Sequence, residues 1–266
     1  MYKLIEKVKH VKPLVLHYTN NVTINDCSNV TLAVGASPLM SFSYEEVDDV
    51  VQAASSVVIN IGTMNSNMLD LYLLAGKAAN KYKKPVILDP VGVFATKARE
   101  DFINRLINEI KFDVVKGNIS EIKFIGGFDV RGQGVDSFDD DEDQTDMIKK
   151  VAKKLDCVIV ATGKIDIITD GDNVYKVNNG TSKLKEITGT GCMIASLVGS
   201  FVPCSKNILE AAAMGTLTMS LGGELANMTY PEIGTFKVNL MNEIYSMNIS
   251  KFSKYADIEY YAEEVK

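Results

Sequence analysis

The chain has 266 residues, of which 46% are hydrophobic and 23% are charged, values typical of a globular protein. This length suits one large α/β domain over residues 1–266, and no linker or repeat divides it. The formal net charge of −6 argues against a general affinity for nucleic acid, which usually needs a basic stripe, but it leaves room for a local basic pocket that holds a nucleotide.

The four cysteines show no C-x-x-C pair and no spacing typical of a zinc site. Such cysteines are typical of reduced proteins of the cytosol. The first residues are rich in lysine and lack the apolar core of a signal peptide, and no apolar run is long enough to cross a membrane. We therefore expect a cytoplasmic protein.

Short runs of consecutive apolar residues, rich in valine and isoleucine, recur through the middle of the chain. Because these runs do not alternate with polar residues, we expect strands that are buried on both faces of a parallel sheet. The segments between them have the apolar spacing of helices, and this alternation is typical of βαβ units. The predicted strands are 57–60, 86–89, 114–116 and 157–161, and the predicted helices are about 66–83, 97–110 and 145–155.

The pattern changes after residue 161. Two apolar runs within 165–177 flank the sequence Asp-Gly-Asp-Asn, a strong hairpin signal. We therefore expect a mostly parallel sheet, flanked by helices, with an antiparallel hairpin late in the sheet. From Gly191 onward the chain is predicted to be helical, over 191–201, about 207–228 and about 235–249. The acidic segment from Asp136 to Asp146 could bind a cation, but such a run is more typical of a solvated loop.

Polar residues follow each predicted strand. Ligands bind beyond the carboxyl ends of the strands in open α/β sheets, so these residues are expected to meet at one edge. Any one of them could be structural, for example Asp89 as a cap before Pro90, but their coincidence favours a binding site. The segments are Asn60-Ile61-Gly62-Thr63, Asp89-Pro90-Val91-Gly92, Lys116-Gly117-Asn118-Ile119-Ser120-Glu121 and Thr162-Gly163-Lys164.

The turn Thr188-Gly189-Thr190-Gly191-Cys192 precedes an apolar run that suits a helix. Glycines let the backbone approach a ligand closely, and a helix that starts near Gly191 would direct free N–H groups into the turn as an anion site. The same field would lower the pKa of the Cys192 thiol and favour the thiolate. The alternative is that Cys192 is a small buried hydrophobic residue.

Together these residues indicate metal-assisted phosphoryl transfer. Lys116 can neutralise a nucleotide phosphate, and Asp89 and Glu121 are oxygen donors suited to Mg²⁺. The amides between Gly189 and Gly191 would stabilise charge on the transferred group.

The chain resembles the hydroxyethylthiazole kinase family of the ribokinase-like superfamily. The most specific motifs are Gly35-Ala36-Ser37-Pro38-Leu39-Met40 and Asp89-Pro90-Val91-Gly92, and the similarity runs over nearly the whole chain. The glycine turn before Cys192 is shared with other kinases of the superfamily. The resemblance implies a ribokinase-like fold and ATP-dependent phosphorylation of the hydroxyl of 4-methyl-5-(2-hydroxyethyl)thiazole in thiamin salvage, with Mg²⁺. It also implies a homotrimer with the substrate site near a subunit interface.

The resemblance implies roles for individual residues by their motif positions. By this comparison, the thiazole is contacted by Met40, Gly189 and Asn25. The nucleotide is bound by Lys116 and Thr162. Asp89 and Glu121 serve the metal, the phosphates and catalysis, and Cys192 faces the reacting hydroxyl.

Three positions depart from the family pattern. Leu16 stands where histidine is common, with His17 next to it, and Phe94 stands where a second glycine is usual. Lys116 replaces a frequent arginine, which keeps the charge but loses the bidentate fork.

Two alternatives remain at this point. A hydroxymethylpyrimidine (phosphate) kinase shares the fold and the Gly-Thr-Gly-Cys turn, whereas a sugar or nucleoside kinase would more often carry aspartate at position 192. A nucleotide-binding protein without activity could use the same scaffold, although the presence of Asp89, Glu121 and Cys192 together argues against it.

Overall fold

The computed structural model describes residues 1–129 and 141–262. The strands of this part are β1 (Leu14–Tyr18), β2 (Ser37–Met40), β3 (Ser56–Asn60), β4 (Val86–Asp89), β5 (Val114–Asn118), β6 (Val158–Thr162), β7 (Asp166–Thr169), β8 (Val174–Val177) and β9 (Ile258–Tyr261). They form one sheet in the order β2-β1-β3-β4-β5-β6-β7-β8-β9. The strands from β2 to β6 are parallel, and β7, β8 and β9 each run antiparallel to the preceding strand. The predicted mostly parallel sheet with a late hairpin is confirmed.

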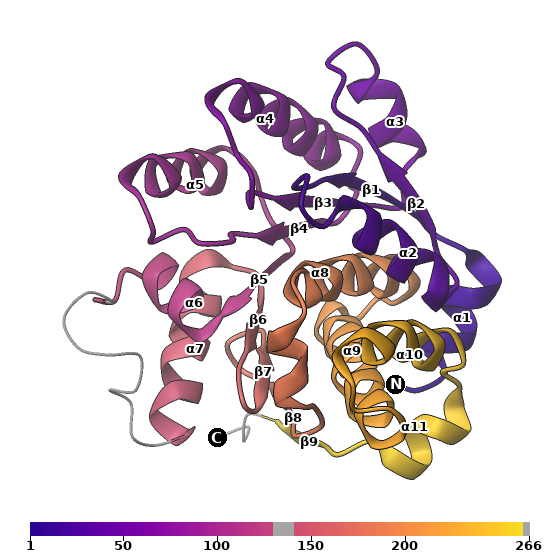
Figure 1. Ribbon diagram of the computed structural model, residues 1–266. Helices are drawn as coiled ribbons and strands as arrows, with labels where there is room; N and C mark the ends of the chain where they lie inside the picture. The colour runs from indigo at the N-terminus through magenta and orange to yellow at the C-terminus, as the bar shows by residue number, and fades with distance from the viewer. Residues whose placement is uncertain (130–140, 263–266) are drawn as a thin grey trace.

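Helices cover both faces of the sheet (Figure 1). One layer contains α1 (Leu4–Val11), α2 (Ile24–Val34), α8 (Thr190–Phe201), α9 (Ile208–Thr229), α10 (Ile233–Tyr245) and α11 (Ile249–Tyr255). The opposite layer contains α3 (Val47–Ala53), α4 (Ser66–Lys81), α5 (Lys97–Glu109), α6 (Ile119–Gly126) and α7 (Asp141–Leu155). Two short 3₁₀ helices, η1 (Ser182–Glu186) and η2 (Val202–Cys204), flank α8.

The central strands are buried on both faces, as their continuous apolar sequences predict. All five residues of β3 are buried. Successive side chains of a strand point to opposite faces, so Val58 packs into the core beneath α8 while Val57 and Ile59 pack into the core beneath α4. Burial of apolar side chains in two separate cores therefore fixes the register of the sheet.

Helix α8 passes through the centre of the molecule, between the sheet and α9 (Figure 1). Each of its residues from Cys192 to Phe201 is buried. A helix that is apolar on all sides requires such complete enclosure. Its N-terminus is consequently held rigidly at the edge of the sheet where the strands end.

Two expectations from the sequence are wrong. The three helices predicted after Gly191 are confirmed as α8, α9 and α10, but the chain does not stay helical, because Ile258–Tyr261 form β9, which pairs with β8. This edge strand is mostly exposed and lacks the buried apolar run that marks the other strands. The acidic segment is not a loop throughout, because α7 begins at Asp141, and acidic residues favour the first turn of a helix. Residues 136–140 lie outside the described part.

None of the helices in the described ranges is both long and apolar enough to span a membrane.

Candidate active site

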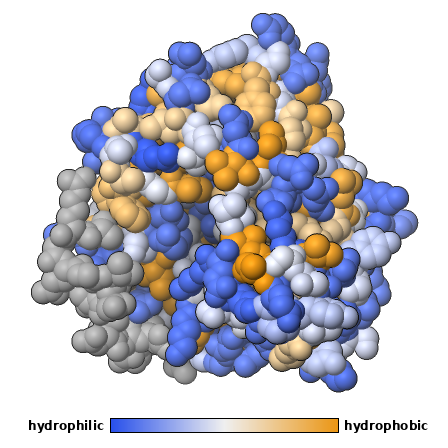
Figure 2. All heavy atoms as spheres, in the orientation of Figure 1, coloured by the Kyte–Doolittle hydropathy of each residue, from blue (hydrophilic) through white to orange (hydrophobic). Residues whose placement is uncertain are grey.

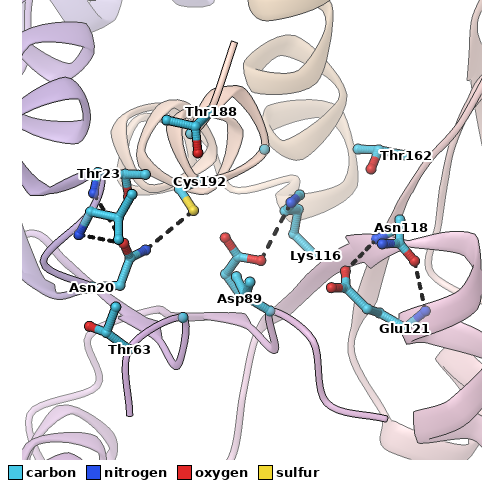
Figure 3. A pocket seen from close by; sticks show the side chains of 15 residues that line it. Asn20, Thr23, Thr63, Asp89, Lys116, Asn118, Glu121, Thr162, Thr188 and Cys192 are labelled. Atoms are coloured by element: carbon cyan, nitrogen blue, oxygen red, sulfur yellow. Dashed lines mark hydrogen bonds and ion pairs between the residues drawn. The ribbon is translucent and has the colours of Figure 1, made fainter. Parts of the chain in front are cut away.

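A cavity of about 360 Å³ opens at the carboxyl ends of the parallel strands (Figure 3). This volume is in the range of small-molecule sites. It gathers the ends of β4, β5 and β6 with the turn before α8, as the sequence predicts. The lining residues are Asn20, Val22, Thr23, Gly62, Thr63, Asp89, Val91, Lys116, Asn118, Glu121, Thr162, Thr188, Gly189, Gly191 and Cys192.

Asp89, the last residue of β4, carries a fully buried carboxylate. Its Oδ2 atom accepts a hydrogen bond of 2.7 Å from Nδ2 of Asn60, and its Oδ1 atom lies 3.4 Å from Nζ of Lys116. Burial raises the pKa of Asp89 to about 6, and the charge of Glu121 adds to this effect, while Lys116 opposes it. The carboxylate is thus close to the point where it can accept a proton near neutral pH.

Lys116 brings a buried positive charge into the cavity from β5. Burial acts against this charge, but the carboxylates of Asp89 and Glu121 outweigh burial and raise the pKa of Lys116. Its ammonium group lies against the start of α8, since a Cβ atom at Gly191 would be 3.1 Å from Nζ. The lysine and the helix N-terminus therefore present positive charge to the same space.

Helix α8 begins at Thr190, one residue before the predicted start. Its N-cap, Gly189, has a φ of +91°, and a Cβ atom there would be 2.7 Å from Cγ2 of Thr23. The positive φ and the close approach of Thr23 both require glycine at this position. Glycine has no side chain that could cap the first amides of the helix. Free N–H groups at a helix start bind anions, so this turn suits a phosphoryl group.

Cys192 lies in the first turn of α8 and faces Asp89 and Asn20 (Figure 3). Its Sγ atom accepts a hydrogen bond of 3.4 Å from Nδ2 of Asn20. Burial and the charge of Asp89 raise the pKa of the thiol, although Lys116 opposes them. The expectation of a lowered pKa is therefore wrong, because desolvation outweighs the helix field and favours the protonated thiol.

Glu121 has a structural role that the sequence did not reveal. Its Oε2 atom accepts a hydrogen bond from the backbone N–H of Asn118. The side chain of Asn118 in turn accepts a hydrogen bond from the backbone N–H of Glu121. These two bonds form a capping box at the start of α6. Its Oε1 atom accepts from the N–H of Gly92 at 2.8 Å. One carboxylate thus joins the loop after β4 to α6, and it keeps lone pairs that face the cavity.

The other predicted residues divide into two groups. Thr162, at the end of β6, lines the cavity and donates a hydrogen bond to the carbonyl of Gly117. Met40 and Asn25 do not line it. Met40 ends the edge strand β2, and Asn25 lies in the first turn of α2, where it accepts a hydrogen bond from Asn29.

Sequence reasoning gave no role to Asn20, Val22 and Thr23, which line the cavity from the loop between β1 and α2. These residues directly follow β1, so a search of the residues after each strand would have found them if 14–18 had been assigned as a strand.

His17 in β1 is not part of the site. It is fully buried between the carbonyl of Val15 and the hydroxyl of Ser196, and burial lowers its pKa to about 4.

Within the described residues, no group of three or more histidine, cysteine, aspartate or glutamate side chains is arranged to hold a metal ion. Asp89 and Glu121 do line one cavity with Lys116 near both carboxylates. Mg²⁺ usually binds through one or two carboxylates together with waters and substrate phosphates. The donors present therefore fit an ion that arrives with a nucleotide, not an ion held by protein alone.

Comparisons with known proteins show the family of the chain. The model of the hydroxyethylthiazole kinase family matches residues 5–250. A hydroxyethylthiazole kinase of Clostridioides difficile is 72% identical over 98% of this chain and 99% of its own, and one of Alkaliphilus oremlandii is 46% identical over 91% and 90%.

The fold comparison gives the same result. The structure of a hydroxyethylthiazole kinase protein from Pyrococcus horikoshii superposes with a TM-score of 0.89 and 32% identity, covering 98% of each chain. A pyridoxal kinase from Staphylococcus aureus, with a TM-score of 0.64 and 12% identity, shares the fold alone. The chain belongs to the hydroxyethylthiazole kinase family.

Proposed function

We propose that this chain transfers the γ-phosphoryl group of ATP to the hydroxyl group of 4-methyl-5-(2-hydroxyethyl)thiazole. The observation that carries the proposal is the meeting of Asp89, Lys116, Cys192 and the uncapped N-terminus of α8 in one cavity. The names of the relatives support the choice of a thiazole alcohol over a hydroxymethylpyrimidine.

The proposed reaction forms a bond between the substrate oxygen and the γ-phosphorus and breaks the bond between that phosphorus and the β–γ bridging oxygen. The hydroxyl proton passes to Cys192 as the thiol proton passes to Asp89, the carboxylate that Cys192 faces. ADP leaves with the bridging oxygen. Positive charge from Lys116 and the first amides of α8 stabilises the transferred group, the largest contribution in a loose phosphoryl transfer.

The nucleotide is proposed to lie along the ends of β5 and β6, where Lys116, Asn118 and Thr162 line the cavity. Asp89 and Glu121 would hold a Mg²⁺ ion together with the phosphates. Such an ion would supply positive charge that offsets the negative charge of the phosphates.

The substrate ring is proposed to lie beside Gly189, near the mouth of the cavity. Val22 lines the cavity there with 63% of its surface exposed, so one wall of the ring site is open in a single chain. Met40 lies on the edge strand and Asn25 on α2, both away from the cavity. We propose that these two residues contact the thiazole only after subunits assemble.

A homotrimer is the assembly that we propose. Large exposed apolar side chains occur on and just before α2, on α10 and at the end of α9, and α10 packs against both other helices. On the face shown in Figure 2, hydrophobic residues are exposed among hydrophilic ones. Exposed apolar side chains in such a group favour contact with another protein surface. The group is Val22, Leu32, Met228, Tyr230, Ile233, Val238 and Tyr245, here called the α2–α10 patch.

The location is proposed to be the cytoplasm, which agrees with the four free cysteines of the chain.

The function is tested by following ADP release from ATP and Mg²⁺ with three alcohols in parallel. The thiazole alcohol, hydroxymethylpyrimidine and ribose represent the proposed enzyme, the alternative within the fold and the sugar kinases. We expect turnover of the thiazole alcohol well above the other two. Turnover of hydroxymethylpyrimidine without turnover of the thiazole would overturn the proposal.

A further inference from the structure

Two side-chain amides join Cys192 to Asp89. Asn20 and Asn60 are 3% and 1% exposed, and neither faces bulk solvent. Nδ2 of Asn20 donates to Sγ of Cys192 at 3.4 Å and to Oδ1 of Asn60 at 2.9 Å. Nδ2 of Asn60 in turn donates to Oδ2 of Asp89 at 2.7 Å. Figure 3 shows the amide of Asn20 directed at the sulfur.

The orientation of both amides is determined by backbone groups that can only donate. Oδ1 of Asn20 accepts from the N–H groups of Val22 and Thr23, each at 3.1 Å. Its NH₂ group must therefore face Asn60 and Cys192. Oδ1 of Asn60 likewise accepts from the N–H of Gly62 at 2.8 Å, which directs its NH₂ group to Asp89.

The space for this arrangement is built into the loop after β3. A Cβ atom at Gly62 would lie 2.9 Å from both Cγ and Nδ2 of Asn20. That separation is too short for any residue other than glycine unless Asn20 moves. Two loops from different parts of the chain thus close around one amide group.

We propose that Asn20 is a positioning residue of the phosphoryl transfer. Its amide holds the sulfur of Cys192 and, through Asn60, keeps the sulfur and the Asp89 carboxylate at a fixed separation while the alcohol reacts. The proposal rests on the proposed function. A buried hydrogen bond of this kind acts on the geometry of the reacting groups, and small displacements there cost large factors in rate.

The kinetic test compares Asn20→Ala and Asn20→Asp with the unchanged protein. Asn20→Asp keeps an acceptor for Val22 and Thr23 but loses the NH₂ donor. We expect both variants to lower kcat by about tenfold to hundredfold with KM for ATP nearly unchanged, since they affect the reacting groups. In a Cys192→Ala background, the further loss from Asn20→Ala should fall to about threefold or less, because the residue through which Asn20 acts is absent.

Asn80→Ala is the matched control. The side chain of Asn80 donates a hydrogen bond to the carbonyl of Lys111 and accepts one from the N–H of Lys111. Asn80 does not line the cavity. This variant should lower Tm without lowering kcat. The proposal is overturned if Asn20→Ala raises the KM for the alcohol at constant kcat, which would make Asn20 a substrate ligand, or if its full effect persists without Cys192.

A second measurement separates this proposal from the proposed function. The Tm losses of Asn20→Ala and Cys192→Ala should combine to less than their sum, because each variant removes the same hydrogen bond. Additive losses would overturn the contact even in a protein that phosphorylates the thiazole. Absence of any turnover with non-additive losses would overturn the proposed function instead.

Discussion

At the scale of single residues, burial decides how each group in the cavity can act. Asp89 and Cys192 both have raised pKa values because both are buried, and Lys116 keeps its charge only because two carboxylates lie near it. A thiol that stays protonated cannot act as a free thiolate base. It can act as a carrier that gives its proton to Asp89 and takes one from the alcohol.

The role of Cys192 is tested by two substitutions. Cys192→Ala removes the proton carrier, and we expect kcat to fall by roughly 10²–10⁴-fold without abolishing turnover, the range typical of general base catalysis. Cys192→Asp provides a carboxylate at a helix N-terminus, where negative charge is favourable, so it should keep substantial activity. Steady-state rates decide between the alternatives. If the aspartate variant is no faster than the alanine variant, and both still bind ATP, the thiol is a packing residue.

Lys116 and Glu121 should differ in which kinetic constant they control. Lys116→Met keeps the apolar stem but removes a charge that we propose contacts phosphate before and during the reaction, so KM for ATP should rise by about tenfold to hundredfold. Glu121→Ala should mainly lower kcat, because it removes a proposed metal donor and the hydrogen bond that holds the loop at Gly92. Lys111→Met is the control, since Lys111 pairs with Asp156 on an exposed surface away from the cavity. Unchanged kinetics for both site variants would place the nucleotide elsewhere.

At the scale of elements, the start of α8 is the feature on which the site depends most. The helix is completely enclosed, so its first turn is held at the end of the sheet by contacts far from the cavity. Glycines at 189 and 191 leave room for Thr23 and for the ammonium group of Lys116.

Gly191→Ala tests this arrangement. The new methyl group would meet Nζ of Lys116 at 3.1 Å, and a flexible side chain can move away from such a contact. We therefore expect a folded protein whose Tm changes little but whose KM for ATP rises severalfold. The control is Gly234→Ala in α10, where no atom lies within 4 Å of the new Cβ. If the two variants have the same KM for ATP, Lys116 does not bind the nucleotide from this position.

The sequence was sufficient to predict the central strands of the sheet, but it missed β1, which is also largely buried. The predicted strands at 57–60 and 86–89 match β3 and β4, and the predicted hairpin matches β7 and β8. Continuous apolar runs identify such strands because both faces of the sheet are covered. Strand β9 has no such signal, because only its pairing with β8 makes it a strand.

The candidate site was predictable where a strand leads directly into it. Asp89, Lys116 and Thr162 were found because each ends or follows a recognisable strand. The contacts of Asn20 could not be predicted, because its partners Asn60 and Cys192 are 40 and 172 residues away in sequence. The direction of the Cys192 pKa shift was missed for a similar reason: the helix field is visible in sequence, whereas the depth of burial is not.

At the scale of the whole molecule, one sheet runs from the N-terminal strands to the strand β9 near the C-terminus. Residues from both ends of the chain pack in the same core, since Ile5 and Phe252 belong to one cluster. This continuity supports the interpretation of the chain as a single domain.

Assembly is tested by measuring the mass in solution. A homotrimer should have three times the chain mass of 29.1 kDa. Val238→Glu places a charge in the α2–α10 patch, at a side chain that is 60% exposed, and should shift the mass toward the monomer. Leu74→Glu on α4, at a side chain 45% exposed on the opposite layer, is the control and should leave the mass unchanged. A monomeric unchanged protein would contradict the proposed trimer.

The central claim is that this cavity phosphorylates the thiazole alcohol, and product formation tests it most directly. The protein and Asp89→Asn are each incubated with ATP, Mg²⁺ and the thiazole alcohol, and the phosphate ester is followed by ³¹P NMR. We predict that the unchanged protein forms the ester and that Asp89→Asn, which loses the proton acceptor and a carboxylate donor to Mg²⁺, forms it at least about 100-fold more slowly. Absence of the ester with the unchanged protein, or equal rates for the two proteins, would contradict the account.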